Sequence, residues 1–491
     1  MSSRHCGCIG KPLPAAGLAC AGWEEGRPYT GGVSSPKNSP RPAQGSAPLH
    51  RLLLQTADAV QAVRDGRSLT ELLARCPAAL RPGTQALSFH VLRQLGSAQA
   101  LRKLLAPKAP PPKVESLLLC ALALLMPQDE PPYADHTVVD QAVEAARARL
   151  KASAGFINAV LRRFLREREA LLAALRSDPL ALHNHPAWWL NRLQADWPEH
   201  WAAMLAINNS RPPMTLRLRA GLEMPAYLQR LAEVGIAAQA FGALAPQALV
   251  LERAQPVEQI PGFAAGEVSV QDAAAQLAAP LTVGALSART AAGQDLALSA
   301  LPAGARLLDA CSAPGGKTAH LLELGAYELQ ALDADEKRLA RVEQNLRRLG
   351  QQARLKAADA RDTAAWWDGQ AFDAILLDAP CSASGIVRRH PDVRWLRRES
   401  DIAALARIQA ELLDALWPLL KPGGRLVYAT CSVFKAEGQA QIDAFLQRQP
   451  SALHLDVKGA TGHLLPLPDN ALQQPVASLD GFFYALLVKP L

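Results

Sequence analysis

The spacing of apolar residues divides the chain into regions of different periodicity. Between residues 48 and 176, apolar positions recur with helical spacing in segments that Pro or Gly separates. These segments include LHRLLLQTADAVQAVRDG, SLTELLARC, QALSFHVLRQLGSAQALRKLLA, VESLLLCALALLM, TVVDQAVEAARARL and GFINAVLRRFLREREALLAAL. Because the connections are short, the pattern predicts a compact all-α bundle that ends near Leu175.

Two further regions follow the helical one. Residues 177–265 mix short helices with candidate strands such as MTLRLRA and ALVLER, which predicts a small α+β domain. After residue 300, helices alternate with the strand candidates ARLLDA, YELQALD, ARLKAAD, FDAILLD and GRLVYAT. This alternation predicts an α/β domain with a doubly wound, Rossmann-like parallel sheet and a ligand site at the carboxyl ends of its strands. We place that domain at residues 266–491, with its core at 303–491.

The ends and the composition of the chain add expectations about location. Residues 1–47 are rich in Gly, Pro, Ser and Ala without apolar periodicity, which predicts a disordered tail without the features of a secretory signal. The longest apolar run, residues 116–126, is far shorter than the roughly 20 residues of a membrane helix, so we expect a cytoplasmic protein. A formal net charge of +7 mildly favours a polyanionic partner. The eight cysteines form no CxxC pair, so we expect neither disulfides nor a metal site.

The first strand of the α/β domain leads into a glycine-containing loop. The loop consists of Cys311, Ser312, Ala313, Pro314, Gly315, Gly316 and Lys317, and a helix follows it. Glycines let a ligand approach the backbone, and a helix N-terminus favours an anionic group. A P-loop would require Gly at position 311, and the dinucleotide GxGxxG spacing is absent. The loop is therefore predicted to bind a ligand of another kind.

Aspartates end the next two strands. Asp333 is placed to accept both hydroxyls of a ribose, and Asp359 is placed to meet an adenine amino group. Each aspartate alone is more often a strand-end or helix cap than a ligand-binding residue. Because successive strands end in this way, the sequence indicates a nucleoside with an anionic appendage, and S-adenosylmethionine has that shape.

Two cysteines lie at the same predicted edge. Cys381 follows Asp378 by three residues, and Cys431 ends the strand RLVYAT. For a single cysteine at a strand end, an inert buried thiol is the commoner situation, since keeping a free thiol ionised at neutral pH costs about 2 kcal/mol. Two cysteines at one ligand-binding edge favour a reactive pair.

An arginine-rich segment, IVRRHPDVRWLRRESDI, follows the first of these cysteines. Such runs are usually solvated surface, but here arginines interleave with His390 and Trp395 beside the candidate site. This arrangement suits phosphate contacts and base stacking on single-stranded RNA. We therefore predict RNA contacts for Arg388, Arg389, His390, Arg394 and Trp395, and weaker evidence points to the helix NAVLRRFLRER.

Three motifs together resemble those of the RNA cytosine-5 methyltransferases. They are DACSAPGGKT, LLDAPCSASG followed by RRHPD and WLRR, and YATCSV. The helical region with GFINAVLRR resembles the NusB-like RNA-binding domain found in this family, and EVSVQDAAAQ and DGFFYALLVKP match it as well. The resemblance covers residues 49–491 approximately. It implies S-adenosylmethionine as the cofactor and 16S rRNA as the partner, before or during subunit assembly, and we expect a monomer.

The resemblance also implies roles for the candidate residues. The loop 311–317 would hold the methionine part of the cofactor, Asp333 its ribose and Asp359 its adenine. Cys431 of the TCS motif would be the nucleophile and Cys381 of the PCS motif would assist release. Asp378 would lie between cofactor and base, and Lys317 would position both.

Alternatives remain open at this point. The same chemistry could act on tRNA, and a NusB-like bundle with an inert C-terminal domain would be a non-catalytic RNA-binding factor. A DNA cytosine-5 methyltransferase would attack with the PC cysteine and would not need Cys431. Residues 281–300 are longer than the connection usual in the family and have no assigned role.

Overall fold

The computed structural model describes residues 47–128, 130–468 and 479–491. The predicted tail, except for Ala47, lies outside the described residues. Among the residues that are described, no helix combines the length and the apolar character needed to cross a membrane.

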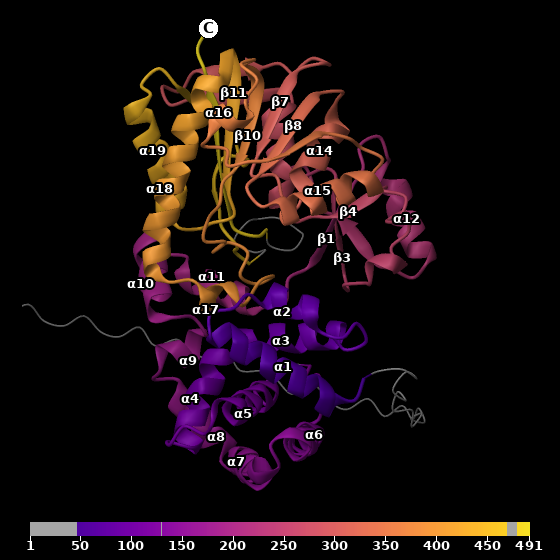
Figure 1. Cartoon of the computed structure of the whole chain (residues 1–491), viewed down its shortest axis with the longest axis vertical. Coiled ribbons are helices and arrows are strands. Elements are labelled where there is room, and N and C mark those ends of the chain that lie inside the picture. Colours follow the sequence, from indigo (N-terminus) through magenta and orange to yellow (C-terminus); the bar gives the residue numbers. More distant parts are fainter. Residues whose placement is uncertain (1–46, 129, 469–478) are drawn as a thin grey trace, which may run out of the picture. The chain divides into compact units, whose positions relative to one another are not determined.

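An all-α bundle forms the first region, as predicted (Figure 1). Its helices are α1 (Leu49–Arg64), α2 (Leu69–Arg75), α3 (Arg81–Arg93), α4 (Leu95–Leu105), α5 (Pro112–Leu124), α6 (Asp135–Arg149), α7 (Ala154–Arg166) and α8 (Arg168–Leu175). The most apolar helix, α5, is buried from Val114 onward and contacts α1, α3, α4, α6 and α7. It is therefore the centre of the bundle.

Three short helices connect the bundle to the rest of the chain. They are α9 (Pro179–His183), α10 (Ala187–Asp196) and α11 (Trp201–Asn209). Helix α9 packs on α4, whereas Trp189 of α10 is buried against Phe434 and Val433 of the C-terminal domain. These helices bridge two domains and do not belong to the small sheet that follows.

The small domain contains a four-stranded antiparallel sheet with the order β2-β3-β1-β4. Its elements are β1 (Met214–Leu218), α12 (Met224–Glu233), β2 (Ala238–Ala240), β3 (Ala248–Leu251) and β4 (Val268–Val270). Strand β4 pairs with β1, although it lies beyond the boundary that we expected at residue 265. The small sheet therefore extends to Val270.

The C-terminal domain is built on a ten-stranded sheet with the path β6-β5-β12-β14-β11-β10-β7-β8-β9, and β13 pairs with β14. The strands are β5 (Leu286–Thr290), β6 (Asp295–Leu298), β7 (Arg306–Ala310), β8 (Glu328–Asp333), β9 (Arg354–Ala357), β10 (Phe372–Asp378), β11 (Leu420–Thr430), β12 (Leu453–Asp456), β13 (Gly462–Leu464) and β14 (Phe482–Val488). Strands β11, β10, β7, β8 and β9 are parallel, as predicted, and the others join antiparallel. The carboxyl ends of the parallel strands therefore meet at one edge.

Helices cover both faces of this sheet (Figure 1). They are α13 (Ala278–Val283), α14 (Gly316–Leu324), α15 (Glu336–Arg348), α16 (Thr363–Trp366), α17 (Val393–Leu396), α18 (Glu399–Leu416) and α19 (Gln439–Arg448). Alternate residues of β10 point to opposite faces: Leu376 packs in the core beside α13 and α14, and Leu377 packs in the core beside α18 and α19. Burial on both faces explains why these strands read as continuous apolar runs.

The segment 281–300, whose role the sequence left open, ends α13 and then forms the β5–β6 hairpin. The hairpin pairs with β12 through Leu455 and Asp456. It therefore extends the edge of the sheet farthest from β9.

Candidate active site

The loop after β7 is shaped by two residues with positive φ. Cys311 has a φ of 68° and Gly315 a φ of 95°. A Cβ atom at Gly315 would lie 3.0 Å from Val342 Cα on α15, so both conformation and space require glycine there. Ser312 N–H donates to Leu332 O over 2.7 Å, which fixes the loop against β8. The predicted residues 311–317 therefore form one rigid turn at the start of α14.

Asp333 and Asp359 flank a cavity of about 140 Å³ next to this turn. The cavity is lined by Cys311, Asp333, Ala334, Ala358, Asp359, Ala360, Arg361, Pro380, Ile408 and Leu412. Asp333 is buried and its Oδ2 accepts from Ala313 N–H over 3.1 Å, whereas Asp359 is exposed and paired with Arg361 over 2.7 Å. Larger hollows lie away from this strand edge.

Unpartnered polar atoms next to the cavity fit a bound polar cofactor. Ser312 Oγ and Asp309 Oδ1 are buried without a hydrogen-bond partner. Burial raises the pKa of Asp309 to about 7, while Thr318 donates to its other oxygen over 2.6 Å. Because buried polar atoms are normally satisfied, these two atoms have hydrogen-bonding capacity that a ligand's polar groups at the turn could use.

Lys317 and Asp378 meet across the site. Lys317 Nζ lies 2.6 Å from Asp378 Oδ2 and 5.4 Å from the centre of the Phe482 ring. Burial would lower the pKa of Lys317, but the Asp378 carboxylate outweighs burial and the net pKa is raised. Lys317 therefore keeps its proton at neutral pH.

The two cysteines are in contact. Cys381 Sγ lies 3.4 Å from Cys431 Sγ, and both side chains are half-buried. The hydrogen bond with Cys431, together with burial, raises the pKa of Cys381. The thiol of Cys381 therefore stays protonated at neutral pH. The sulfur atoms of the two cysteines, which the sequence predicted at one edge of the sheet, therefore lie side by side.

A buried glutamate that the sequence did not reveal lies beneath the cysteines. Glu437, in a short 3-10 helix (Lys435–Glu437), accepts hydrogen bonds from Ser382 and Ser432, the residues that follow the two cysteines. In the sequence it resembles an ordinary loop carboxylate, so burial was the missing signal.

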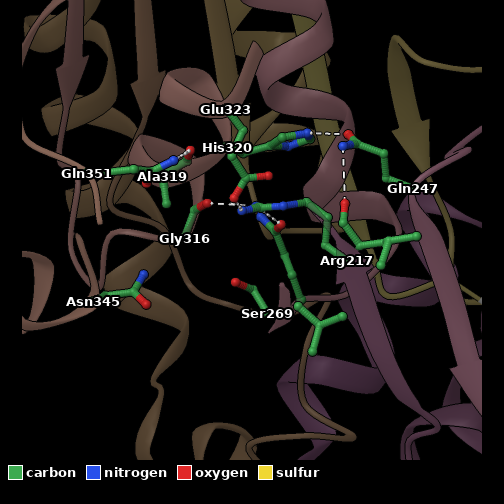
Figure 2. Close-up of polar contacts among 12 residues, drawn as sticks. Arg217, Gln247, Ser269, Gly316, Ala319, His320, Glu323, Asn345 and Gln351 are labelled. Atoms are coloured by element: carbon green, nitrogen blue, oxygen red, sulfur yellow. Dashed lines mark hydrogen bonds and ion pairs between the residues drawn. The ribbon is translucent and has the colours of Figure 1, made fainter. Parts of the chain in front are cut away.

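A polar cluster fixes α14 to the small domain (Figure 2). Arg217 of β1 is buried, donates to Gly316 O over 3.0 Å and pairs with Glu323 over 2.7 Å. His320 Nε2 lies 2.8 Å from Gln247 Oε1. The small domain therefore anchors the helix that begins at the turn 311–317.

The arginine-rich segment is occupied by contacts within the protein. Arg388 is buried and pairs with Asp480 over 2.6 Å, and Arg389 pairs with Asp480 and, over 2.7 Å, with Asp272. Arg394 is fully buried, which lowers its pKa to about 9. Buried guanidinium groups cannot reach a phosphate, so the predicted direct RNA contacts do not fit Arg388 and Arg394.

The remaining residues of this segment differ in exposure. Trp395 packs against the helical bundle and donates to Leu92 O over 2.8 Å, so its ring is not free to stack on a base. His390 is exposed, as an RNA contact requires. Arg397 donates to Cys381 O over 3.1 Å and thereby supports the PCS loop.

Three family models match the chain along its length. The NusB family matches residues 51–166, the ferredoxin-like domain of Methyltr_RsmF/B-like proteins matches 185–258, and the 16S rRNA methyltransferase RsmB/F family matches 297–488. These ranges correspond to the bundle, the small domain with α10 and α11, and the α/β domain. The predicted architecture is thereby confirmed.

Relatives and solved structures agree with these matches. The chain is 45% identical over 452 residues to ribosomal RNA small subunit methyltransferase B of Pseudomonas putida, covering 89% of this chain and 98% of the relative. It is 41% identical to the protein of the same name from Vibrio cholerae, covering 87% and 95%. The crystal structure of PH0851 shares the fold with a TM-score of 0.69 at 22% identity, covering 90% and 99%. The chain therefore belongs to the RsmB/F family of 16S rRNA methyltransferases.

Proposed function

We propose that the protein transfers the methyl group of S-adenosylmethionine to carbon 5 of a cytosine in 16S rRNA through a covalent cysteine adduct. The contact between Cys381 and Cys431, beside the Lys317–Asp378 pair and the cavity between Asp333 and Asp359, carries the proposal. The names of the relatives support rRNA as the substrate class.

The cofactor would lie along the edge formed by β7, β8 and β9. The turn 311–317 would hold its methionine part, Asp333 its ribose hydroxyls and Asp359 its adenine end. When bound there, S-adenosylmethionine supplies the electrophilic methyl group.

Cys431 is the nucleophile of the proposal. Carbon 5 of cytosine is a poor nucleophile until a thiolate adds to carbon 6 and converts the ring into an enamine. Because the pKa of Cys381 is raised by its hydrogen bond with Cys431, Cys381 keeps its proton and can donate it in a hydrogen bond to Cys431. A thiol that donates in this way stabilises a thiolate on Cys431.

Asp378 and Lys317 supply the proton that N3 of the cytosine receives. Attack at carbon 6 is assisted when N3 receives a proton, and Asp378 is the candidate donor. The Lys317 ammonium, 2.6 Å from Asp378 Oδ2, can replace that proton and stabilise the carboxylate.

Cys381 takes part in release. Once Cys431 is bonded to carbon 6, it no longer forms the hydrogen bond that raised the pKa of Cys381. The pKa of Cys381 then falls, so that this thiol can lose its proton to solvent and, as the thiolate or through a water that it orients, remove the hydrogen from carbon 5. Elimination of Cys431 completes the reaction.

The test uses labelled cofactor and unmodified 16S rRNA. Cys431→Ala should abolish methyl transfer and form no adduct, whereas Cys381→Ala should accumulate an enzyme–RNA adduct that survives denaturing electrophoresis. Cys120→Ala, which removes a buried thiol of α5, is the matched control and should behave as wild type. The opposite adduct pattern would reverse the two roles.

Substrate choice is tested separately. Bisulfite sequencing of rRNA and tRNA from a strain that lacks the protein should reveal one cytosine that loses its methyl group in 16S rRNA. Loss of a methylated cytosine from a tRNA alone would favour the alternative in which tRNA is the substrate. No loss in either RNA would favour the non-catalytic RNA-binding factor.

A further inference from the structure

The two cysteines share a feature that the proposed chemistry does not use: each precedes a fully buried serine. Ser382 follows Cys381 and Ser432 follows Cys431. Both hydroxyls donate to the same oxygen, Glu437 Oε2, over 2.5 and 2.7 Å. One carboxylate oxygen therefore joins the two sulfur-bearing loops.

The second oxygen of Glu437 holds the same loops. Oε1 accepts from Ser382 N–H over 2.8 Å and from Gln409 Nε2 over 3.2 Å. Gln409 also donates to Pro380 O over 2.9 Å. The carboxylate therefore receives four donors, three of which belong to the residues following the cysteines.

Burial of this carboxylate requires an explanation beyond packing. Glu437 is fully buried, and within the described part of the chain no Lys, Arg or His forms an ion pair with it. Burying an unpaired charge is costly unless hydrogen bonds compensate for it. An apolar residue of similar volume would avoid the cost of burying a charge, so the charge indicates a role in arranging its donors.

We propose that Glu437 is a positioning residue that holds the Cys381 and Cys431 loops in register by accepting hydrogen bonds from Ser382 and Ser432. The inference rests on the proposed two-cysteine reaction. It adds a group that touches neither substrate nor cofactor and acts through the serines.

The charge of Glu437 has a second effect in the same direction. It contributes to the raised pKa of Cys381, after the hydrogen bond with Cys431 and burial. The charge thus favours the protonated form of the Cys381 thiol.

Glutamine cannot replace Glu437 in this arrangement. Its single carbonyl oxygen must face Ser382 N–H, because a backbone N–H cannot turn into an acceptor. Its NH₂ group would then face the two serine hydroxyls. Ser432 Oγ already accepts from Phe434 N–H over 3.1 Å, and Ser382 Oγ from Ser384 N–H over 3.3 Å. Each hydroxyl would then have to accept from the amide as well as from a backbone N–H and direct its own proton elsewhere, so glutamine reverses both serine hydrogen bonds of the bridge.

The experiment compares Glu437→Gln, Ser382→Ala, Ser432→Ala and the double variant Glu437→Gln/Ser432→Ala at saturating rRNA and cofactor. We expect kcat of Glu437→Gln to fall about 100-fold while both KM values stay within about twofold, since small misplacements of reacting groups have effects of this size. The serine variants should show smaller losses in the same direction, and the double variant should resemble Glu437→Gln, because both changes break one bridge.

A control separates positioning from general destabilisation. Glu115→Gln removes a buried carboxylate of α5 that pairs with Arg64 and Arg102, remote from the cysteines. It should lower the thermal midpoint but leave kcat unchanged. Wild-type kcat in the folded Glu437 and serine variants, or fully additive losses in the double variant, would overturn the proposal. Failure of the proposed function would appear separately, as no adduct in Cys381→Ala with Glu437 intact.

Discussion

Two arginine-rich segments of this chain have opposite fates. In the segment 386–402, Arg388 and Arg394 are buried and bonded to other parts of the protein. On α7, Arg162 and Arg166 are exposed beside Phe156, while the opposite face of the helix packs into the bundle. The comparison teaches that arginine density alone does not identify an RNA-binding surface, because only an exposed guanidinium group can reach a phosphate.

The largest expected effect comes from Arg394. Its guanidinium donates to Asn208 O over 2.7 Å and to Asn184 O over 3.2 Å. Arg394→Ala leaves these buried acceptors unsatisfied and opens a cavity, so we expect a loss of about 3 kcal/mol in unfolding free energy. Chemical denaturation followed by tryptophan fluorescence measures it. Arg398→Ala, an exposed neighbour, should change stability by less than about 0.5 kcal/mol.

A smaller stability effect is expected at Arg388. Arg388→Ala leaves Asp480 with Arg389 as an ion-pair partner, so we expect a loss of about 2 kcal/mol and an unchanged salt dependence of RNA binding. The loss should shrink in an Asp480→Asn background, because the two residues are coupled. A reduced dependence of RNA affinity on salt, with unchanged stability, would instead show that Arg388 contacts RNA.

The smallest effect on stability, and the clearest on binding, is expected on α7. Arg162→Ala/Arg166→Ala should leave the denaturation midpoint unchanged but lower the slope of log affinity against log salt by roughly 1.4, about 0.7 for each phosphate that the variant no longer neutralises. Filter binding of 16S rRNA across a salt series measures the slope. The pair Arg347→Ala/Arg407→Ala removes exposed charges from α15 and α18 and should leave the salt slope nearly unchanged. Equal reductions in both pairs would show that net charge alone governs binding.

Sequence reasoning succeeded where local pattern determines structure. The strands that end at Asp333 and Asp378 were predictable because burial on both faces produces continuous apolar runs. Their parallel order then brought Cys381 and Cys431 to one edge without any knowledge of long-range contacts.

Sequence reasoning failed where the burial of a residue depends on partners that are distant in the chain. Arg394 finds its acceptors at Asn184 and Asn208, far away in the chain, so its neighbours in sequence could not reveal that it is buried. Glu437 likewise reads as a loop residue until the Cys381 loop folds over it. The β5–β6 hairpin was missed because its edge strands are short and partly exposed.

The contacts of segment 386–402 limit how the domains of this protein can be exchanged. Leu69 N–H of the bundle donates to Asp392, Trp395 donates to Leu92 O, and Arg93 donates to Arg388 O. The bundle is therefore not a detachable module, because gene fission or domain shuffling between the two would strand these donors and acceptors. A replacement N-terminal domain would have to supply new partners for these groups of the segment that follows Cys381.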